Sequence, residues 1–468
     1  MSPHTQHPHA PTRTQRDTGD TRGNAATATA ASGFRPDIQG IRAIAVGAVV
    51  LNHLIAWPTG GFVGVDVFFV VSGFLITGLL LRERERTGRI SMRQFFTRRI
   101  RRIMPAAAVT IAVTTALGFL ILSPTRAQAT LGDGLFASIF LANWRFAAGG
   151  TDYFASDMGT SPLQHFWTLS VEEQFYLVWP WMLIATLAIA AAAASRAGKT
   201  IATTTQRRIL AAVLIPIVAA SLIWSIVETA TAPSVAYFAT ASRIWELGAG
   251  ALLALGAGLF ARIGTRARTA LAIAGLVGIL VSMITLTEQT PFPGPFALIP
   301  VLATVALLAS GIGGTHALQG PLAHPVMTRI GDMSYSIYLW HFPVIVFAAV
   351  LAPAGGPLVA GLTLVAIAGL SLASYVFVEA PFRHPRAKKT KDADALAPSK
   401  PRTARGQSAM GWSRRTVALA ASFALLIPVA AVAAPRIAES ASASATPVSA
   451  AADLTAGLEA AADASVWP

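Results

Sequence analysis

The sequence contains no cysteine among its 468 residues, which excludes disulfide bonds and thiol chemistry. Charge is also scarce, because Asp, Glu, Lys and Arg make up 12% of the chain, against about 25% in a typical soluble domain. Hydrophobic residues account for 54%, and the mean hydropathy is +0.57. This balance argues against a soluble protein, and repeated apolar runs of near-bilayer length predict an all-α, polytopic membrane protein.

An apolar leader is also missing, because residues 1–33 are polar and lack a hydrophobic core. We therefore expect no cleavable signal peptide, and a disordered cytoplasmic tail over this range. The tail contains His4, His7 and His9, but we expect no metal site in this protein.

Eleven apolar runs are close to the length that crosses a bilayer, about 20 residues. Ten should form the core bundle, and the last should be an additional C-terminal helix. The loop at 123–168 should be the longest external one, and its acidic and aromatic residues suit sugar binding or ordinary packing. The predicted spans lie near 41–57, 62–81, 103–122, 169–193, 209–227, 235–257, 269–286, 296–314, 334–352, 357–378 and 415–434.

The net charge of +14 does not require a nucleic-acid partner. Lys and Arg cluster in alternate loops between the apolar runs, which is the pattern that orients a membrane protein. The positive-inside rule then predicts a cytoplasmic N-terminus and an extracytoplasmic C-terminal tail in the cell membrane.

Arg42 and His53 lie eleven residues apart in the first apolar run. Both should project from one helix face, roughly 16 Å apart along the axis. We expect Arg42 at the membrane surface, where it could bind phosphate, and His53 near mid-membrane. A neutral histidine can accept a hydroxyl proton near neutral pH. The alternative is an interfacial anchor and a histidine that only packs in the bundle.

A dense arginine block precedes the third run and contains Arg98, Arg99, Arg101 and Arg102. Guanidinium groups bind phosphate oxygens bidentately. Arg98, Arg99 and Arg102 are therefore candidates for binding a phosphate-bearing ligand. The alternative is charge that sets topology and contacts anionic lipids.

Other polar residues inside the apolar runs could line a substrate path or serve packing alone. Arg243 and Glu246 are three residues apart, so they can pair on one helix. Ser334, Tyr338 and His341 recur at helical spacing and form a polar stripe on one face. Such stripes usually face the interior of a membrane bundle.

Three acidic residues complete the candidate set. Asp66 lies in a glycine-rich stretch where close helix packing is expected. Glu172 belongs to a segment with the spacing of a capping box that starts at Ser170. Glu379 ends the tenth run, where it could pair with an arginine or with His53.

Six segments occur in one order between Phe34 and Arg383: F-R-P-D-I-Q-G-I-R-A, G-F-V-G-V-D-V-F-F-V-V-S-G-F-L-I, R-R-I-R-R-I-M-P, F-W-T-L-S-V-E-E-Q-F-Y-L-V-W-P, S-R-I-W-E-L-G-A-G and S-Y-S-I-Y-L-W-H-F-P. Together they resemble the membrane-bound acyltransferase-3 family, O-acyltransferases that modify bacterial surface glycans. The resemblance implies transfer of an acyl group, with acetyl favoured, from cytoplasmic acyl-CoA. The acceptor would be a hydroxyl of an extracytoplasmic glycan or glycolipid, and no permanently bound cofactor is implied.

The resemblance also implies roles for individual residues. His53 would be the general base, and Arg42 would hold donor phosphate or orient the thioester. The family pattern R-x-x-R maps onto Arg99 and Arg102. The family has an acid in the region of Glu379, which makes that residue a catalytic candidate.

The resemblance makes 34–383 the acyltransferase unit. We expect a basic cytoplasmic linker at 384–414, a span at 415–434 and a disordered extracytoplasmic tail at 435–468. Many relatives with such a last span continue into an SGNH hydrolase-like domain, whose G-D-S and D-x-x-H motifs this tail lacks. Two alternatives therefore stay open: a half-enzyme that passes acyl groups to a separate SGNH partner protein, and a glycan or lipid transporter without chemistry.

Overall fold

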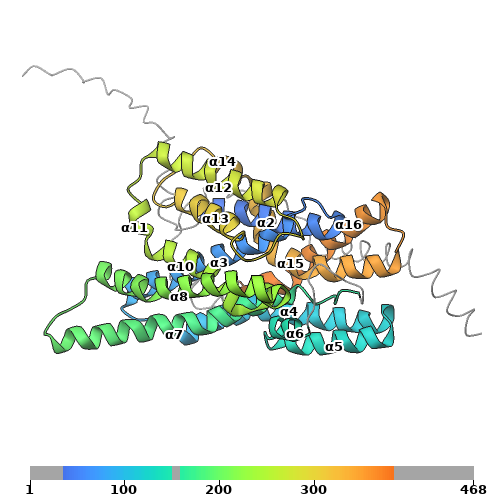
Figure 1. Cartoon of the computed structure of the whole chain (residues 1–468), viewed down its shortest axis with the longest axis horizontal. Helices are drawn as coiled ribbons and strands as arrows, with labels where there is room; N and C mark the ends of the chain where they lie inside the picture. The colour runs from blue at the N-terminus through green and yellow to red at the C-terminus, as the bar shows by residue number, and fades with distance from the viewer. Residues whose placement is uncertain (1–34, 150–158, 384–468) are drawn as a thin grey trace, which may run out of the picture.

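The computed structural model describes residues 35–149 and 159–383, and these two ranges contain helices but no strand (Figure 1). The all-α fold class is therefore confirmed for them. In chain order the elements are α2 (Pro36–Ile55), the 3₁₀ helix η1 (Gly61–Val63), α3 (Gly64–Thr87), α4 (Met92–Ile121), α5 (Pro124–Ser138), α6 (Ala142–Ala148), α7 (Phe166–Arg196), α8 (Thr203–Thr231), α9 (Pro233–Phe238), α10 (Thr240–Leu255), α11 (Ala257–Phe260), α12 (Thr265–Thr285), α13 (Leu298–Ser310), α14 (Gln319–Leu322), α15 (Pro325–Leu351), α16 (Pro357–Ser374), the π-helical turn η2 (Tyr375–Glu379) and α17 (Ala380–Arg383).

Eight helices in the described ranges are long and apolar enough to cross a membrane. They coincide with eight of the eleven predicted spans and comprise α2, α3 with η1, α4, α7, α8, α12, α15 and α16 with its continuation. Two more predicted spans coincide with α10 and α13. These helices have only 16 and 13 residues, short of the roughly 20 that a full crossing needs. The eleventh predicted span, both tails and the linker lie outside the described residues.

The outer surface of the bundle is apolar. Leu177 and Trp181 of α7, Ile223 of α8 and Ile284 of α12 are each more than half exposed. An apolar surface of this extent is unusual in a soluble monomer but is well solvated by hydrocarbon. Together with the eight long helices, it defines a multi-pass membrane protein.

Local sequence explains where the first helices begin and end. α2 begins at Pro36, whose missing N–H costs nothing in a first helical turn. α3 ends at Gly88, which adopts a left-handed φ of 73°. α4 begins after Ser91, whose side chain accepts a hydrogen bond from the backbone N–H of Gln94. These caps make the turn that returns the arginine block to the bundle.

Glycines allow α3 and α10 to pack closely. A side chain at Gly73 would collide with the backbone carbonyl of Leu247, and one at Gly250 with that of Val70. Small residues permit such approaches between membrane helices. α2 packs on α15 in turn, and α2, α3 and α15 lie in the interior between α12–α14 on one side and α7 on the other (Figure 1).

The predicted loop at 123–168 is helical over its first part, where α5 and α6 form. Asp133 accepts hydrogen bonds from Nε of Arg145 at 2.5 Å and from Oγ of Ser161 at 2.6 Å. These bonds favour the packing interpretation of Asp133 over sugar binding. The predicted loop therefore contains two helices, and its location outside the membrane stays a prediction.

Candidate functional site

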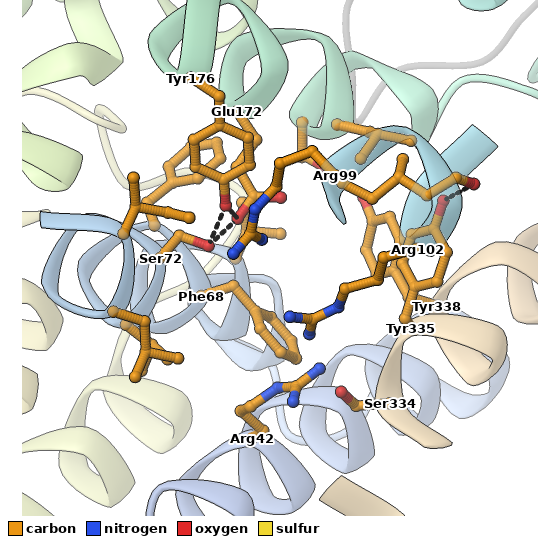
Figure 2. Close-up of a pocket in the computed structure, with 18 residues that line it drawn as sticks. Arg42, Phe68, Ser72, Arg99, Arg102, Glu172, Tyr176, Ser334, Tyr335 and Tyr338 are labelled. Atoms are coloured by element: carbon orange, nitrogen blue, oxygen red, sulfur yellow. Dashed lines mark hydrogen bonds between the residues drawn. The ribbon is translucent and has the colours of Figure 1, made fainter. Parts of the chain in front are cut away.

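A cavity of about 110 Å³ lies inside the bundle where α2, α3, α4, α7 and α15 meet (Figure 2). Apolar side chains from α3 form much of its wall. Its polar lining consists of Arg42, Ser72, Arg99, Arg102, Thr168, Glu172, Tyr176, Ser334, Tyr335 and Tyr338.

Arg42, Arg99 and Arg102 bring three positive charges to this cavity (Figure 2). Arg99 and Arg102 are three residues apart on α4, so they project from the same side. Within the described residues neither of them makes a hydrogen bond or an ion pair, although Arg99 lies 5.4 Å from the ring centre of Tyr176. Arg42 donates to Oε1 of Gln39 at 2.9 Å. Cations gathered without bonded carboxylates form a site suited to an anionic ligand, and phosphate matches their geometry.

Glu172 lies in the cavity wall within a network of hydroxyl groups (Figure 2). Ser72 donates a short hydrogen bond to its carboxylate, and the hydroxyl of Tyr176 donates to Oγ of Ser72 at 2.8 Å. The predicted capping box is wrong, because α7 already begins at Phe166 and Ser170 bonds the carbonyl of that residue inside the helix. Glu172 is therefore a hydrogen-bonded acid in the cavity.

Three histidines gather beside the cavity, at the far end of α2. Nδ1 of His53 lies 3.2 Å from Nε2 of His341, and the ring centres of His165 and His341 are 5.5 Å apart. Sequence reasoning missed His165, whose only signal is its place directly before the fourth matching segment. Among residues 35–149 and 159–383, no three acidic or histidine side chains have the arrangement of a metal site.

Arg42 and His53 both face α15, as their spacing predicts. Arg42 shares the cavity with Ser334, whereas His53 contacts His341 further along α15. Because α2 starts at Pro36, Arg42 lies about two turns inside the helix, and His53 lies in its last turn. The depths of Arg42 and His53 in the membrane stay predictions.

Arg243 forms a separate buried ion cluster with Asp66 and Glu246. Its Nη1 lies 3.0 Å from Oδ1 of Asp66 and 2.9 Å from Oε1 of Glu246, and all three side chains are at most 1% exposed. The predicted pairing of Arg243 with Glu246 is confirmed. None of the three lines the cavity, so their place along a substrate path stays a prediction.

Glu379 and Arg98 also lie outside the cavity lining. Oε2 of Glu379 accepts a hydrogen bond from Ser336 at 2.8 Å, and its Oε1 lies 3.6 Å from Nη1 of Arg383. The predicted partner of Glu379 is therefore an arginine and not His53. Arg98 is exposed and pairs with Glu83 at 3.0 Å, so the structure does not bring it to Arg99 and Arg102.

Fold and site together define a multi-pass helical membrane protein with an arginine-lined internal cavity and a histidine cluster beside it. The chain belongs to the acyltransferase-3 family, whose model, described as an acyltransferase domain, matches residues 35–378. The resemblance drawn from the six segments is thereby confirmed.

Three relatives that match the chain are described as O-acetyltransferases or putative O-acetyltransferases. The chain is 31% identical over 364 residues to "Peptidoglycan O-acetyltransferase OatA" of Listeria monocytogenes, covering 75% of this chain and 56% of that protein. It is 32% identical over 362 residues to "Putative peptidoglycan O-acetyltransferase YrhL" of Bacillus subtilis, covering 75% and 55%. It is 31% identical over 326 residues to "Putative O-acetyltransferase SAS0844" of Staphylococcus aureus, covering 67% and 51%. The chain thus spans about half the length of these relatives. No solved structure matches it.

Proposed function

We propose that this protein is a membrane O-acyltransferase that transfers an acetyl group from cytoplasmic acyl-CoA to a hydroxyl of an extracytoplasmic glycan or glycolipid. The observation that carries the proposal is the cavity with Arg42, Arg99 and Arg102, which bond to no carboxylate among the described residues. Acyl-CoA carries phosphate groups, which guanidinium groups bind bidentately. The descriptions of the relatives support acetyl as the transferred group and a cell-wall glycan as the acceptor.

The proposed orientation follows the distribution of arginine. The turn that joins α3 to α4 would lie in the cytoplasm, because its surroundings carry Arg82, Arg84, Arg86, Arg89 and Arg93. Arg99 and Arg102 would then face the cytoplasmic half of the membrane, where acyl-CoA enters. The C-terminal end of α2, with His53, would face the acceptor side.

In the proposed reaction the acceptor hydroxyl attacks the carbonyl carbon of the thioester while His53 removes its proton. A carbon–oxygen bond forms and the carbon–sulfur bond breaks. Protonated His53 returns its proton to the departing CoA thiolate, so the products are an acyl ester and free CoA. A positioned general base contributes about 10²- to 10⁴-fold to such a step. Arg42, which shares its helix face with His53, would orient the thioester between the phosphate site and the base.

The acidic residues would serve as counter-charges and hydrogen-bond acceptors. Glu379 lies close enough to Arg102 and Arg42 to attract both electrostatically, so we propose that it sets their spacing. Glu172 would accept hydrogen bonds from the donor within the cavity. The ion cluster around Arg243 would brace α3 against α10 beside this path.

The test uses the purified full chain in liposomes with labelled acetyl-CoA. Release of free CoA and transfer of label are followed with and without a crude cell-envelope glycan, beside His53→Ala. We expect release that requires both His53 and the acceptor. Release without a labelled acceptor, converted to transfer by an added SGNH-domain protein, would favour the half-enzyme. The absence of any release from folded protein would overturn the proposal in favour of a transporter.

A further inference from the structure

Two backbone carbonyl groups of α15 fix two histidine rings. Nδ1 of His341 lies 2.6 Å from the carbonyl oxygen of Tyr338, and because a carbonyl only accepts, this Nδ1 carries a proton. Pro343 has no N–H for the carbonyl of Leu339 four residues earlier. Nε2–H of His165 donates to that carbonyl at 3.1 Å. The helix therefore dictates which ring nitrogen holds the proton in both residues.

The proton on Nδ1 leaves the lone pair of neutral His341 on Nε2. His341 is fully buried, and no carboxylate of the described residues bonds to it, so a charged ring there would be costly. Nδ1 of His53 lies 3.2 Å from this Nε2, and the two ring planes are within 15° of parallel. A hydrogen bond between these nitrogens requires the proton of His53 on Nδ1. The lone pair of neutral His53 is then on Nε2.

We propose that His341 is a positioning residue that holds His53 in the tautomer with its proton on Nδ1 and its lone pair on Nε2. This inference rests on the proposed function of His53 as general base. When Nε2 of His53 takes the hydroxyl proton, Nδ1–H of the resulting imidazolium stays bonded to His341. Neutral His341, whose own Nδ1–H is hydrogen-bonded to the carbonyl of Tyr338, thus orients the base His53. A carboxylate often has this role beside a catalytic histidine.

Two variants of His341 test its acceptor nitrogen Nε2 and its donor nitrogen Nδ1 one at a time. In His341→Gln the amide reaches the place of Nε2, so it can accept from His53 but loses the bond to the Tyr338 carbonyl. In His341→Asn the amide reaches only the place of Nδ1, so it keeps the Tyr338 bond and leaves Nδ1 of His53 without this acceptor. We expect His341→Asn to lower kcat by about 10²- to 10⁴-fold, the contribution of a general base, with KM for acetyl-CoA unchanged. His341→Gln should retain most of the activity.

Thermal unfolding of both variants in detergent controls for folding. Equal losses of kcat in two folded variants, or the reverse order of activity, would overturn the proposal. If His341 served packing alone, His341→Gln would not be expected to retain more activity than His341→Asn.

A second readout does not depend on activity. It uses the ¹⁵N NMR signals of the histidine rings in labelled wild-type protein. The ring signals that disappear in His53→Ala belong to His53. They should show a proton on Nδ1 that is hydrogen-bonded to a nitrogen of another ring. A proton on Nε2 of His53 would overturn the proposal even in active protein and even where the His341 variants fail to fold. An inactive wild-type protein with the expected tautomer would instead refute the proposed function and leave the tautomer assignment standing.

Discussion

The hydroxyl of Tyr338 lies 2.5 Å from Oγ1 of Thr168 and donates to the backbone carbonyl of His165 at 2.7 Å. These bonds join α15 to α7 beside the histidine cluster. Phe68 packs against the same tyrosine, with ring centres 6.5 Å apart. Tyr338, Thr168 and Phe68 line the cavity, whereas His53 does not. These three residues form the part of the cavity wall next to the histidine cluster, and we call this part of the wall the partition.

We expect Tyr338→Phe to weaken this partition and to uncouple thioester cleavage from transfer. The variant loses two hydrogen bonds between α15 and α7, each worth about 0.5–1.5 kcal/mol, while its ring still fills the space. Water should then reach the thioester more easily, so CoA release without acceptor should rise several-fold relative to release with acceptor. The ratio is measured with labelled acetyl-CoA in liposomes.

Tyr335→Phe is the matched control for that variant. The hydroxyl of Tyr335 lines the same cavity but donates to the carbonyl of Ile103 at 2.9 Å, away from the partition. Its removal should leave the ratio of uncoupled to coupled release unchanged. The same ratio in both variants would rule out the partition at Tyr338.

Arg102→Ala should weaken binding of the donor. A hydrogen bond to a charged group contributes about 1.5–3 kcal/mol, so KM for acetyl-CoA should rise about 10- to 100-fold. The change in kcat should be smaller, because the lost contact is to phosphate and not to the reacting carbonyl. Arg102→Lys should be intermediate, since lysine keeps the charge and loses the bidentate fork. Arg101→Ala removes an exposed neighbour of the same type, and an equal effect there would refute a specific phosphate site.

The sequence predicted the long helices well because hydropathy measures the cost of moving a segment into hydrocarbon. Hydropathy also marked the run that contains α10, but it does not show that Asp66 of α3 joins Arg243 and Glu246 and so makes their burial tolerable. α5 was missed because Arg126 and Asp133 interrupt its apolar residues.

The candidate site also has some features that the sequence predicts and others that it does not. The shared face of Arg42 and His53 follows from helical spacing within one segment, so it could be predicted. The choice between Arg98 and Arg99 depends on how α4 is rotated about its axis, which is a tertiary property. The meeting of His53 with His165 and His341 joins three elements, and no spacing within one segment encodes it.

Arg243→Met should destabilise the fold strongly. It leaves the carboxyl groups of Asp66 and Glu246 buried without their shared cation, and breaking a buried pair in this way costs about 3–5 kcal/mol. The midpoint of thermal unfolding in detergent should fall, together with the yield of folded protein. Arg207→Met is the control, because its partner Glu85 is 34% exposed and such pairs contribute only about 0–1 kcal/mol. Similar midpoints for the two variants would show that the buried cluster does not stabilise the bundle.

Gly250→Ala and Gly47→Ala should change stability in opposite directions. The added methyl group at Gly250 meets the backbone carbonyl of Val70, which cannot rotate away, so α3 and α10 must separate. Overpacking of this kind costs about 1–3 kcal/mol. Apart from its chain neighbours and the backbone of α2 itself, no atom lies within 4 Å of a new methyl group at Gly47, so alanine there should stabilise α2 by about 0.5–1 kcal/mol through its better helix propensity. Thermal unfolding in detergent distinguishes the two cases, and a gain in stability at both positions would mean that α3 and α10 do not depend on glycine for their contact.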